Sequence, residues 1–309
     1  VERQIIETIR RITGDNHPIG LRLGIGDDTA VYEPPPCEDL LLTTDQVVEG
    51  THFRRSMHPA HALGYKTVAR AVSDIGAMGG ESRCVLLALS LPAWAQGDWL
   101  GRYLRGLSLA VERFDAPLVG GDVARGERFS AALTVVGSVP PATALTRSGA
   151  KPGDMLYVSG RLGGSVLGLE VLSKGGSSRT VAARRHLYPE PRLELGRFLR
   201  RQVGVSAVID LSDGLSVDAA KLAMASSVAA EIESLRVPRF RGASIDRAIF
   251  GGEEYELLFA VRPETKVPAV FENLALTRIG RITTGSGVTL RTEKGVRILK
   301  AEGFQHFQG

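Results

Sequence analysis

The sequence has little cysteine and no long apolar stretch, and both absences exclude classes of protein. Its two cysteines, Cys37 and Cys84, lack the CxxC spacing of a zinc or redox site and are too few for a disulfide framework. The longest apolar run, residues 85–89, is far shorter than the about 18 residues that span a bilayer. Residues 1–7 carry two acidic side chains and lack the basic start and apolar core of a signal peptide. We therefore expect a cytoplasmic protein without a membrane span.

The sequence has no segment in which charges of one sign are concentrated. The 38 Lys and Arg residues stand against 34 Asp and Glu residues, which gives a formal net charge of +4. Arginine doublets occur, as at Arg10-Arg11 and Arg200-Arg201, but there is no long basic run with interleaved aromatic residues. This pattern favours a small anionic substrate over nucleic acid.

The common signatures of nucleotide-binding and hydrolytic enzymes are also missing. There is no GxxxxGK[ST] loop and no kinase HRD or DFG motif, and residues 24–26 (GIG) lack the third glycine of a dinucleotide fingerprint. His58 and His61 have no HExxH context, and Ser212 has no GxSxG setting. The sequence therefore does not support a mainstream nucleotide-binding fold. It also does not support a zinc hydrolase or an enzyme with a serine nucleophile.

The length of 309 residues favours two domains of roughly 150 residues each over one unusually large domain. Pro140-Pro141 ends a clear half-buried strand, so we place the boundary there, with domains at 1–140 and 141–309. Because neither half alternates strictly between strand and helix, the sequence favours an α+β fold over a doubly wound sheet. Apolar spacing predicts helices near 3–12, 59–79, 94–114, 163–173, 191–202 and 215–226, and strands near 40–44, 84–91, 129–139, 155–159, 206–210, 228–234 and 255–261.

What the sequence does have is a set of aspartates beside glycine, serine or threonine, each expected where a strand or helix gives way to a turn. Taken singly, each is well explained as a turn or helix-cap residue. Taken together, they suit a hard cation such as Mg²⁺, which prefers oxygen ligands and shares them with water and substrate phosphates. The set, which predicts magnesium and a polyphosphate, is Asp27, Asp28, Asp45, Asp74, Asp122, Asp210 and Asp213.

Eight segments of the sequence resemble the ordered motifs of the thiamine-monophosphate kinase family. A single motif such as GGD is weak, but together the segments cover nearly the whole chain. The wider superfamily, which includes aminoimidazole ribonucleotide synthetase and selenophosphate synthetase, would not be expected to carry the LTRSGAKPGD and GGExYEL segments together. The eight are 24–30 (GIGDDTA), 43–53 (TTDQVVEGTHF), 73–79 (SDIGAMG), 120–122 (GGD), 145–154 (LTRSGAKPGD), 209–215 (IDLSDGL), 251–259 (GGEEYELLF) and 303–307 (GFQHF).

The resemblance implies ATP-dependent phosphorylation of thiamine monophosphate to thiamine diphosphate, the last step of thiamine diphosphate biosynthesis, by in-line transfer assisted by several Mg²⁺ ions. It implies a synthetase-like α+β fold in which residues 1–140 bind ATP and magnesium. This N-terminal domain would join two subunits through a β-barrel-like interface, and residues 141–309 would form a C-terminal α/β domain of sandwich type. A homodimer with ATP and thiamine monophosphate as ligands is therefore expected, with neither nucleic acid nor membrane.

The resemblance also implies roles for single residues, none of them a nucleophile or general base. The acceptor phosphate has a second pKa of about 6 and is mostly ionised near neutral pH, so no base is required. Val72, Glu254 and Phe304 stand where the family more often has Asn, Asp and Trp or Tyr. The implied ligands of magnesium are Asp28, Thr43, Thr44, Asp45, Asp74, Asp122, Asp210 and Asp213, those of ATP are Tyr103, Gly121, Asp122, Arg147 and Ser212, and those of thiamine monophosphate are His52, Glu253 and Phe304.

Two alternatives remain open on the sequence alone. One is a sibling enzyme of the superfamily, which would use ATP to activate an oxygen of a different substrate. The other is a non-catalytic protein that binds metal or nucleotide and in which the aspartates are structural.

Overall fold

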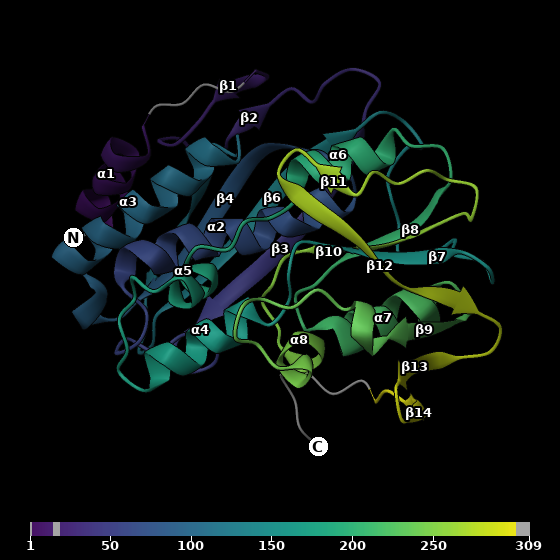
Figure 1. Cartoon of the computed structure of the whole chain (residues 1–309). Helices are drawn as coiled ribbons and strands as arrows, with labels where there is room; N and C mark the ends of the chain where they lie inside the picture. Colours follow the sequence, from purple (N-terminus) through teal and green to yellow (C-terminus); the bar gives the residue numbers. More distant parts are fainter. Residues whose placement is uncertain (1, 15–18, 301–309) are drawn as a thin grey trace. The chain divides into compact units, whose positions relative to one another are not determined.

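The chain divides into two compact units. The computed structural model describes residues 2–14 and 19–300 (Figure 1). Unit 1 comprises Val1–Ile75 and Gly80–Thr143, and unit 2 comprises Gly76–Gly79 and Ala144–Gly309. Within the described ranges, no helix is both long and apolar enough to cross a membrane.

Unit 1 is built on a four-stranded sheet in the order β3-β6-β4-β5. Strands β3 and β4 both pair antiparallel with β6, and β5 pairs parallel with β4. The elements of this unit are α1 (Glu2–Thr13), β1 (Leu21–Leu23), β2 (Val31–Tyr32), β3 (Asp39–Val48), α2 (Ala60–Ala77), β4 (Glu81–Leu91), the 3₁₀ helix η1 (Ala93–Ala95), α3 (Asp98–Arg113), β5 (Leu118–Arg125) and β6 (Ser130–Val139).

One face of this sheet is buried under helices and the other is open. Along β3, Leu41 and Val47 are buried, whereas Leu40 and Leu42 on the opposite face are exposed, Leu42 by 71%. Helix α2 lies over the buried face, where it contacts β3 through side-chain hydrogen bonds. The open face carries exposed leucines beside Thr44 and Thr134, and among the described residues the sheet of one chain does not close into a barrel.

Helices α2 and α3 of unit 1 approach closely because glycine stands at their contact. A Cβ on Gly106 would lie 1.8 Å from the carbonyl oxygen of His61, and one on Gly64 would lie 1.9 Å from that of Tyr103. The Tyr103 hydroxyl donates to Thr67 Oγ1 across the same contact, at 3.1 Å. These contacts set the position of α2, and therefore of the polar side chains that α2 presents to β3.

Unit 2 is built on a larger mixed sheet in the order β14-β13-β9-β12-β7-β10-β8, with β11 paired to β12. Only the β13–β9 pair is parallel among the described strands of this sheet. Its elements are β7 (Met155–Ser159), α4 (Gly164–Ser173), α5 (Val181–Leu187), α6 (Leu193–Arg200), β8 (Val205–Asp210), α7 (Leu215–Ala225), β9 (Ala229–Glu233), the 3₁₀ helix η2 (Ser234–Arg236), α8 (Ile245–Phe250), β10 (Leu257–Val261), β11 (Val270–Phe271), β12 (Leu274–Thr283), β13 (Gly287–Thr292) and β14 (Gly295–Ile298).

Both faces of the central strands of unit 2 are buried. On β10, Leu258 and Ala260 belong to the core shared with α7, and Leu257 and Phe259 belong to a second core shared with α6. The alternation follows from the two-residue period of a strand. A charged residue near such a strand must therefore find its partners inside the protein, as Glu256 does.

Among the described elements, the spacing of apolar residues predicts six of the eight α-helices and seven of the fourteen strands, and it predicts none of the strands after residue 261. The strand expected at 155–159 is found with the same bounds, and helix α7 differs from the expected 215–226 by one residue. The helix expected from residue 94 begins only at Asp98, because residues 93–95 form a 3₁₀ turn. Strand β5 was not expected at all, since the Gly-Gly pair within it is typical of a turn.

The contact between α2 and α3 generates a stability prediction. We expect Gly106→Ala to lower the free energy of unfolding of the chain by about 2 kcal/mol, because the new methyl group overlaps backbone and the helices must separate. Gly101→Ala on the same helix is the control, since its Cβ has only an ordinary 3.6 Å contact with Arg105. Urea denaturation of both variants measures the difference, and equal stabilities would contradict the proposed packing.

Candidate functional site

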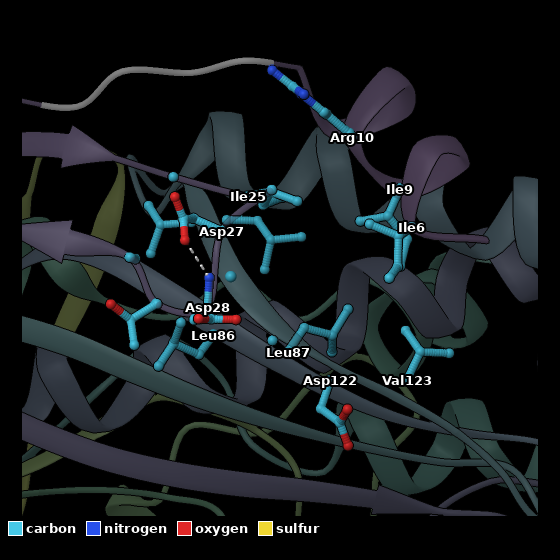
Figure 2. Close-up of a pocket in the computed structure, with 18 of the residues that line it drawn as sticks. Ile6, Ile9, Arg10, Ile25, Asp27, Asp28, Leu86, Leu87, Asp122 and Val123 are labelled. Atoms are coloured by element: carbon cyan, nitrogen blue, oxygen red, sulfur yellow. Dashed lines mark hydrogen bonds between the residues drawn. The ribbon is translucent and has the colours of Figure 1, made fainter. Parts of the chain in front are cut away.

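A cavity of about 1150 Å³ in unit 1 brings three of the expected aspartates to one surface. Asp27 and Asp28 come from the loop between β1 and β2, and Asp122 comes from β5. Figure 2 shows Ile6 and Ile9 of α1 at one end of this cavity and Asp27 and Asp28 toward the other. The cavity therefore combines an apolar wall with carboxylates, as a site for an amphipathic ligand requires.

Two glycines shape the backbone that lines this cavity. A Cβ on Gly121 would lie 1.9 Å from the carbonyl oxygen of Leu87, so only glycine permits this pairing of β5 with β4. Gly26 has φ +127°, a conformation that side chains rarely adopt, and it precedes the Asp27 carboxylate that accepts from the N–H of Asp28 at 2.8 Å. The residues of the GIGDDTA and GGD motifs thus line one cavity.

A second group of expected ligands lies between β3 and α2, also in unit 1. Thr43 and Asp45 are two residues apart and face α2, where Arg70 and Asp74 lie one turn apart on one face. Thr43 Oγ1 donates to Asp74 Oδ2 at 2.6 Å. Arg70 Nε and Nη2 donate to the two carboxylate oxygens of Asp45 at 3.0 and 3.1 Å.

Strand geometry separates Thr44 from this group. Because side chains alternate along β3, Thr44 is on the open face of the sheet, where it accepts from Thr134 Oγ1 at 3.3 Å. The expectation that these aspartates end strands or helices is wrong for Asp45 and Asp122, which lie within β3 and β5, and for Asp74, which lies within α2. Thr44 as a magnesium ligand stays a prediction.

Two more expected site residues of unit 1 differ in their access to a ligand. His52 is half-buried beside the end of β3, and its Nδ1 accepts from the N–H of Val48 at 3.1 Å, so its proton is on Nε2 when the ring is neutral. Tyr103 is fully buried, and its ring stacks on Trp99. Burial raises the pKa of Tyr103. An ATP contact by Tyr103 stays a prediction, and it requires the ring to leave this core.

In unit 2, the IDLSDGL motif joins the end of β8 to α7. Asp210 is the last residue of β8 and is buried, whereas Asp213 is partly exposed. Lys221 donates to both Asp213 and Asp218, the latter at 2.8 Å. Asp218 is buried and also accepts from the backbone N–H groups of Asp213 and Gly214, at 2.9 and 3.0 Å. Asp218 and Lys221 were missed, although their three-residue spacing on an expected helix was visible in the sequence.

The GGEEYEL segment folds against the same motif in a strained conformation. Glu253 and Tyr255 have φ of 60° and 52°, values that residues with a side chain adopt rarely. The N–H of Glu253 donates to the carbonyl of Ser212 at 2.7 Å, and the N–H of Tyr255 to that of Leu211 at 2.9 Å. Ser212 and Glu253, expected to bind ATP and thiamine monophosphate, are thereby held next to each other.

A buried ionic network fixes the end of this segment. The Glu256 carboxylate accepts from Arg192 Nε and Nη2 at 2.8 and 2.6 Å, and also from Arg185 and Ser159. Burial alone would raise the pKa of Glu256, but the charges and hydrogen bonds of Arg192 and Arg185 outweigh it and lower the pKa to about 2. Glu256 is therefore ionised in the folded protein. Glu256 was not among the expected site residues, because it directly precedes the apolar strand β10.

Glu254 is a second buried acid with a different environment. Its Oε1 accepts from the N–H groups of Gly163 and Ser165 at the start of α4, at 2.8 and 3.0 Å. Its Oε2 has no hydrogen bond and lies 3.6 Å from Arg185 Nε. Burial raises the pKa of Glu254 to about 7, against the opposing effects of Arg185 and the two N–H groups. The larger acid at this position thus reaches a helix N-terminus that it caps.

Arg147 and Phe304 are the remaining expected site residues. Arg147 is exposed in the loop before β7, where its carbonyl accepts from Ser226 Oγ at 3.0 Å. Phe304 lies outside the described residues. Across the described ranges, no three acidic, histidine or cysteine side chains are grouped closely enough to hold a metal ion. The carboxylate and hydroxyl oxygens present nevertheless fit magnesium in kind, since it prefers hard oxygen ligands.

Comparison with known proteins accounts for this combination of motifs and fold. Residues 26–139 match the family model described as AIR synthase related protein, N-terminal domain, and residues 151–293 match the corresponding C-terminal domain. The thiamine-monophosphate kinase of Escherichia coli is 36% identical over 94% of this chain and 93% of its own length. The chain belongs to the thiamine-monophosphate kinase family. The enzyme of Synechococcus elongatus, 35% identical over 91% of each chain, agrees with this assignment.

Solved structures of the thiamine-monophosphate kinase family share the fold. That of the enzyme from Stenotrophomonas maltophilia has a TM-score of 0.81 and 34% identity, and covers 93% of this chain and 95% of its own. A structure described as AaThiL complexed with AMPPCP and TMP has a TM-score of 0.80 and 33% identity, and covers 99% and 97%. The hydrogenase maturation protein HypE, with a TM-score of 0.77 at 17% identity, shares the fold alone.

The raised pKa of Glu254 predicts how the stability of the fold depends on pH. Because its folded pKa is raised from 4.5 to about 7, Glu254 stabilises the fold below pH 4.5, and this contribution is lost as the pH rises to 7. We expect the free energy of unfolding of Glu254→Gln, relative to wild type, to increase over that interval by at most about 3 kcal/mol.

Urea denaturation at several pH values measures this relative stability. Glu264→Gln is the control, since it removes an exposed carboxylate of the same unit. A difference between Glu254→Gln and wild type that stays constant from pH 4.5 to 7 would show that Glu254 is ionised in the folded protein throughout.

Proposed function

We propose that this chain transfers the γ-phosphoryl group of ATP to the phosphate of thiamine monophosphate, giving ADP and thiamine diphosphate. Membership of the thiamine-monophosphate kinase family carries the proposal. The structure of AaThiL complexed with AMPPCP and TMP supports ATP and thiamine monophosphate as the two substrates. The alternative of a sibling enzyme is less well supported, because the relatives at 35% and 36% identity are thiamine-monophosphate kinases, whereas HypE is only 17% identical.

We assign the ligands to the residues that the family motifs imply. Asp28 and Asp122 of the unit 1 cavity, with Gly121 beside them, suit the phosphates of ATP and their magnesium ions. The other proposed magnesium ligands are Thr43, Thr44, Asp45, Asp74, Asp210 and Asp213, further ATP contacts are Tyr103, Arg147 and Ser212, and the contacts of thiamine monophosphate are His52, Glu253 and Phe304. Magnesium bound there would neutralise the phosphates and align the attacking and leaving oxygens in line.

The chain's own residues then need only bind and orient the two substrates. The acceptor oxygen is mostly ionised near neutral pH, so no side chain has to remove a proton from it. Consistent with this, the residues assigned to magnesium are carboxylates and hydroxyls. The backbone N–H of Glu253 donates to the carbonyl of Ser212, and the Glu253 carboxylate lies 3.5 Å from His186 Nδ1, so the residue is held in place, which suits a role in orienting the acceptor.

We also propose that residues 1–140 form the dimerisation and ATP domain and residues 141–309 the second α+β domain. The open face of the unit 1 sheet, which carries Leu40, Leu42 and Leu86, is the surface that a second copy would cover. Two such sheets facing each other would form the barrel-like interface that one chain lacks. A cytoplasmic location stays a prediction.

The activity is tested by incubating the purified chain with ATP, MgCl₂ and thiamine monophosphate. We expect thiamine diphosphate and ADP in equal amounts by chromatography and ³¹P NMR, and no product after excess chelator, because the anionic phosphates then repel. Thiamine in place of its monophosphate is the substrate control. ATP binding without any thiamine diphosphate would refute the kinase proposal and favour a binding protein.

The assignment of the unit 1 cavity is tested by Asp122→Asn. Loss of this carboxylate should lower kcat by about 100-fold, the order of effect seen when a single electrostatic contact to the transition state is removed. Glu127→Gln, an exposed acid just after the same strand, is the matched control and should keep wild-type kcat. Wild-type kcat in Asp122→Asn would remove Asp122 from the site.

A further inference from the structure

Arg70 donates hydrogen bonds to both carboxylate oxygens of Asp45, which the proposed function assigns as a magnesium ligand. Its Nε and Nη2 donate to Oδ2 and Oδ1 at 3.0 and 3.1 Å. The two side chains retain only 11% and 28% of their exposure, so water screens the pair weakly. Asp45 Oδ1 also accepts from the N–H of Gln46 at 2.8 Å. A divalent cation cannot bind Asp45 in this arrangement without displacing the guanidinium from at least one oxygen.

The neighbouring residues show what such a cation would meet. Arg70 and Asp74 lie one turn apart on α2, and Thr43 and Asp45 lie two residues apart on the facing side of β3. Thr43 donates to Asp74 beside the Arg70–Asp45 pair, so two carboxylates, a hydroxyl and one guanidinium share the contact between β3 and α2. The guanidinium keeps its charge at every physiological pH, so deprotonation cannot release Asp45.

We propose that Arg70 is a built-in competitor of the divalent cation at Asp45. In the metal-free protein its guanidinium neutralises Asp45 and joins α2 to β3, and metal binding at Thr43, Asp45 and Asp74 requires that Arg70 release at least one Asp45 oxygen. Arg70 thereby stabilises the metal-free chain and weakens its affinity for the metal. This inference rests on the proposed function, which places magnesium at Asp45.

A similar arrangement in unit 2 supports this interpretation. Lys221 donates to Asp213, another proposed magnesium ligand, and at the same time to the buried Asp218. In each unit, therefore, a cationic side chain on a helix neutralises a carboxylate to which the proposed function assigns a metal. The arrangement also explains why repulsion between carboxylates need not strain the metal-free fold, since Asp45 and Asp213 each have an internal counter-charge.

The experiment measures binding of Mn²⁺ alone, as a spectroscopic substitute for Mg²⁺, by the EPR signal of the free ion. Wild type, Arg70→Gln and Arg70→Lys are compared without nucleotide or thiamine monophosphate. We expect Arg70→Gln to bind Mn²⁺ about tenfold more tightly than wild type, the factor that corresponds to about 1.4 kcal/mol. Its melting temperature without metal should fall, and added Mn²⁺ should raise that temperature more than it does in wild type.

The variant Arg70→Lys keeps the charge but cannot donate in the bidentate geometry, so its affinity for Mn²⁺ should fall between those of wild type and Arg70→Gln. It also keeps the proposal testable if Arg70→Gln fails to fold. Equal or weaker Mn²⁺ binding by the folded variants would overturn the proposal. A weaker affinity for ATP together with unchanged Mn²⁺ binding would also overturn it, since Arg70 would then be a phosphate-binding residue.

The outcome is distinguishable from failure of the proposed function, because the titration needs no turnover. If wild type forms thiamine diphosphate and the variants bind Mn²⁺ as wild type does, the role of Arg70 alone is refuted. If no thiamine diphosphate forms but Arg70→Gln binds Mn²⁺ more tightly, the competition at Asp45 stands and the kinase activity is refuted.

Discussion

Glu256 has almost no access to solvent, and its charge must be neutralised within the protein. Two guanidinium groups and a serine hydroxyl do this, and the residues that supply them lie on β7, in α5 and just before α6. The carboxylate therefore joins the start of β10 to three other elements of unit 2. Because an unpaired buried carboxylate costs several kcal/mol, these elements cannot shift independently. The strained residues before β10 keep their left-handed conformations on this support, and with them the place of Glu253 beside Ser212.

Three acids of the family motifs have a partner within the chain that neutralises or caps them. Asp45 has Arg70, Asp213 has Lys221, and Glu254 has a helix N-terminus. A ligand that binds Asp45 or Asp213 has to compete with the cation already there, whereas the N–H groups at Glu254 do not outweigh burial, which raises the pKa of Glu254 to about 7. The carboxylates of the unit 1 cavity differ, since Asp28 and Asp122 are exposed. This contrast divides the motif residues into a group open to solvent and a group held by the chain itself.

Much of the fold could be predicted from apolar spacing, because long helices and buried strands carry a strong period. The bounds of β7, and those of α7 to within one residue, followed from this spacing. Strand β5 was missed because its glycines are explained only by the close approach of β4. The cavity-lining aspartates were found from their chemistry. Arg70 and Lys221 were not, although their spacing from Asp74 and Asp218 on expected helices was visible, because a cation four or three residues from an acid is common on any exposed helix. Thr44 faces away from Thr43 and Asp45 because side chains alternate along a strand. This could be inferred only once β3 was known to extend through residue 48.

The open face of the unit 1 sheet has a consequence for handling the protein. A sheet face on which Leu42 is 71% exposed lowers the colloidal stability of an isolated chain and favours non-specific association. If a second copy covers this face, the folded population depends on total protein concentration by mass action, and dilution and heating act on the same equilibrium. Activity measured after high dilution would then decay with time, at a rate set by dissociation of the pair rather than by the chemistry of the site.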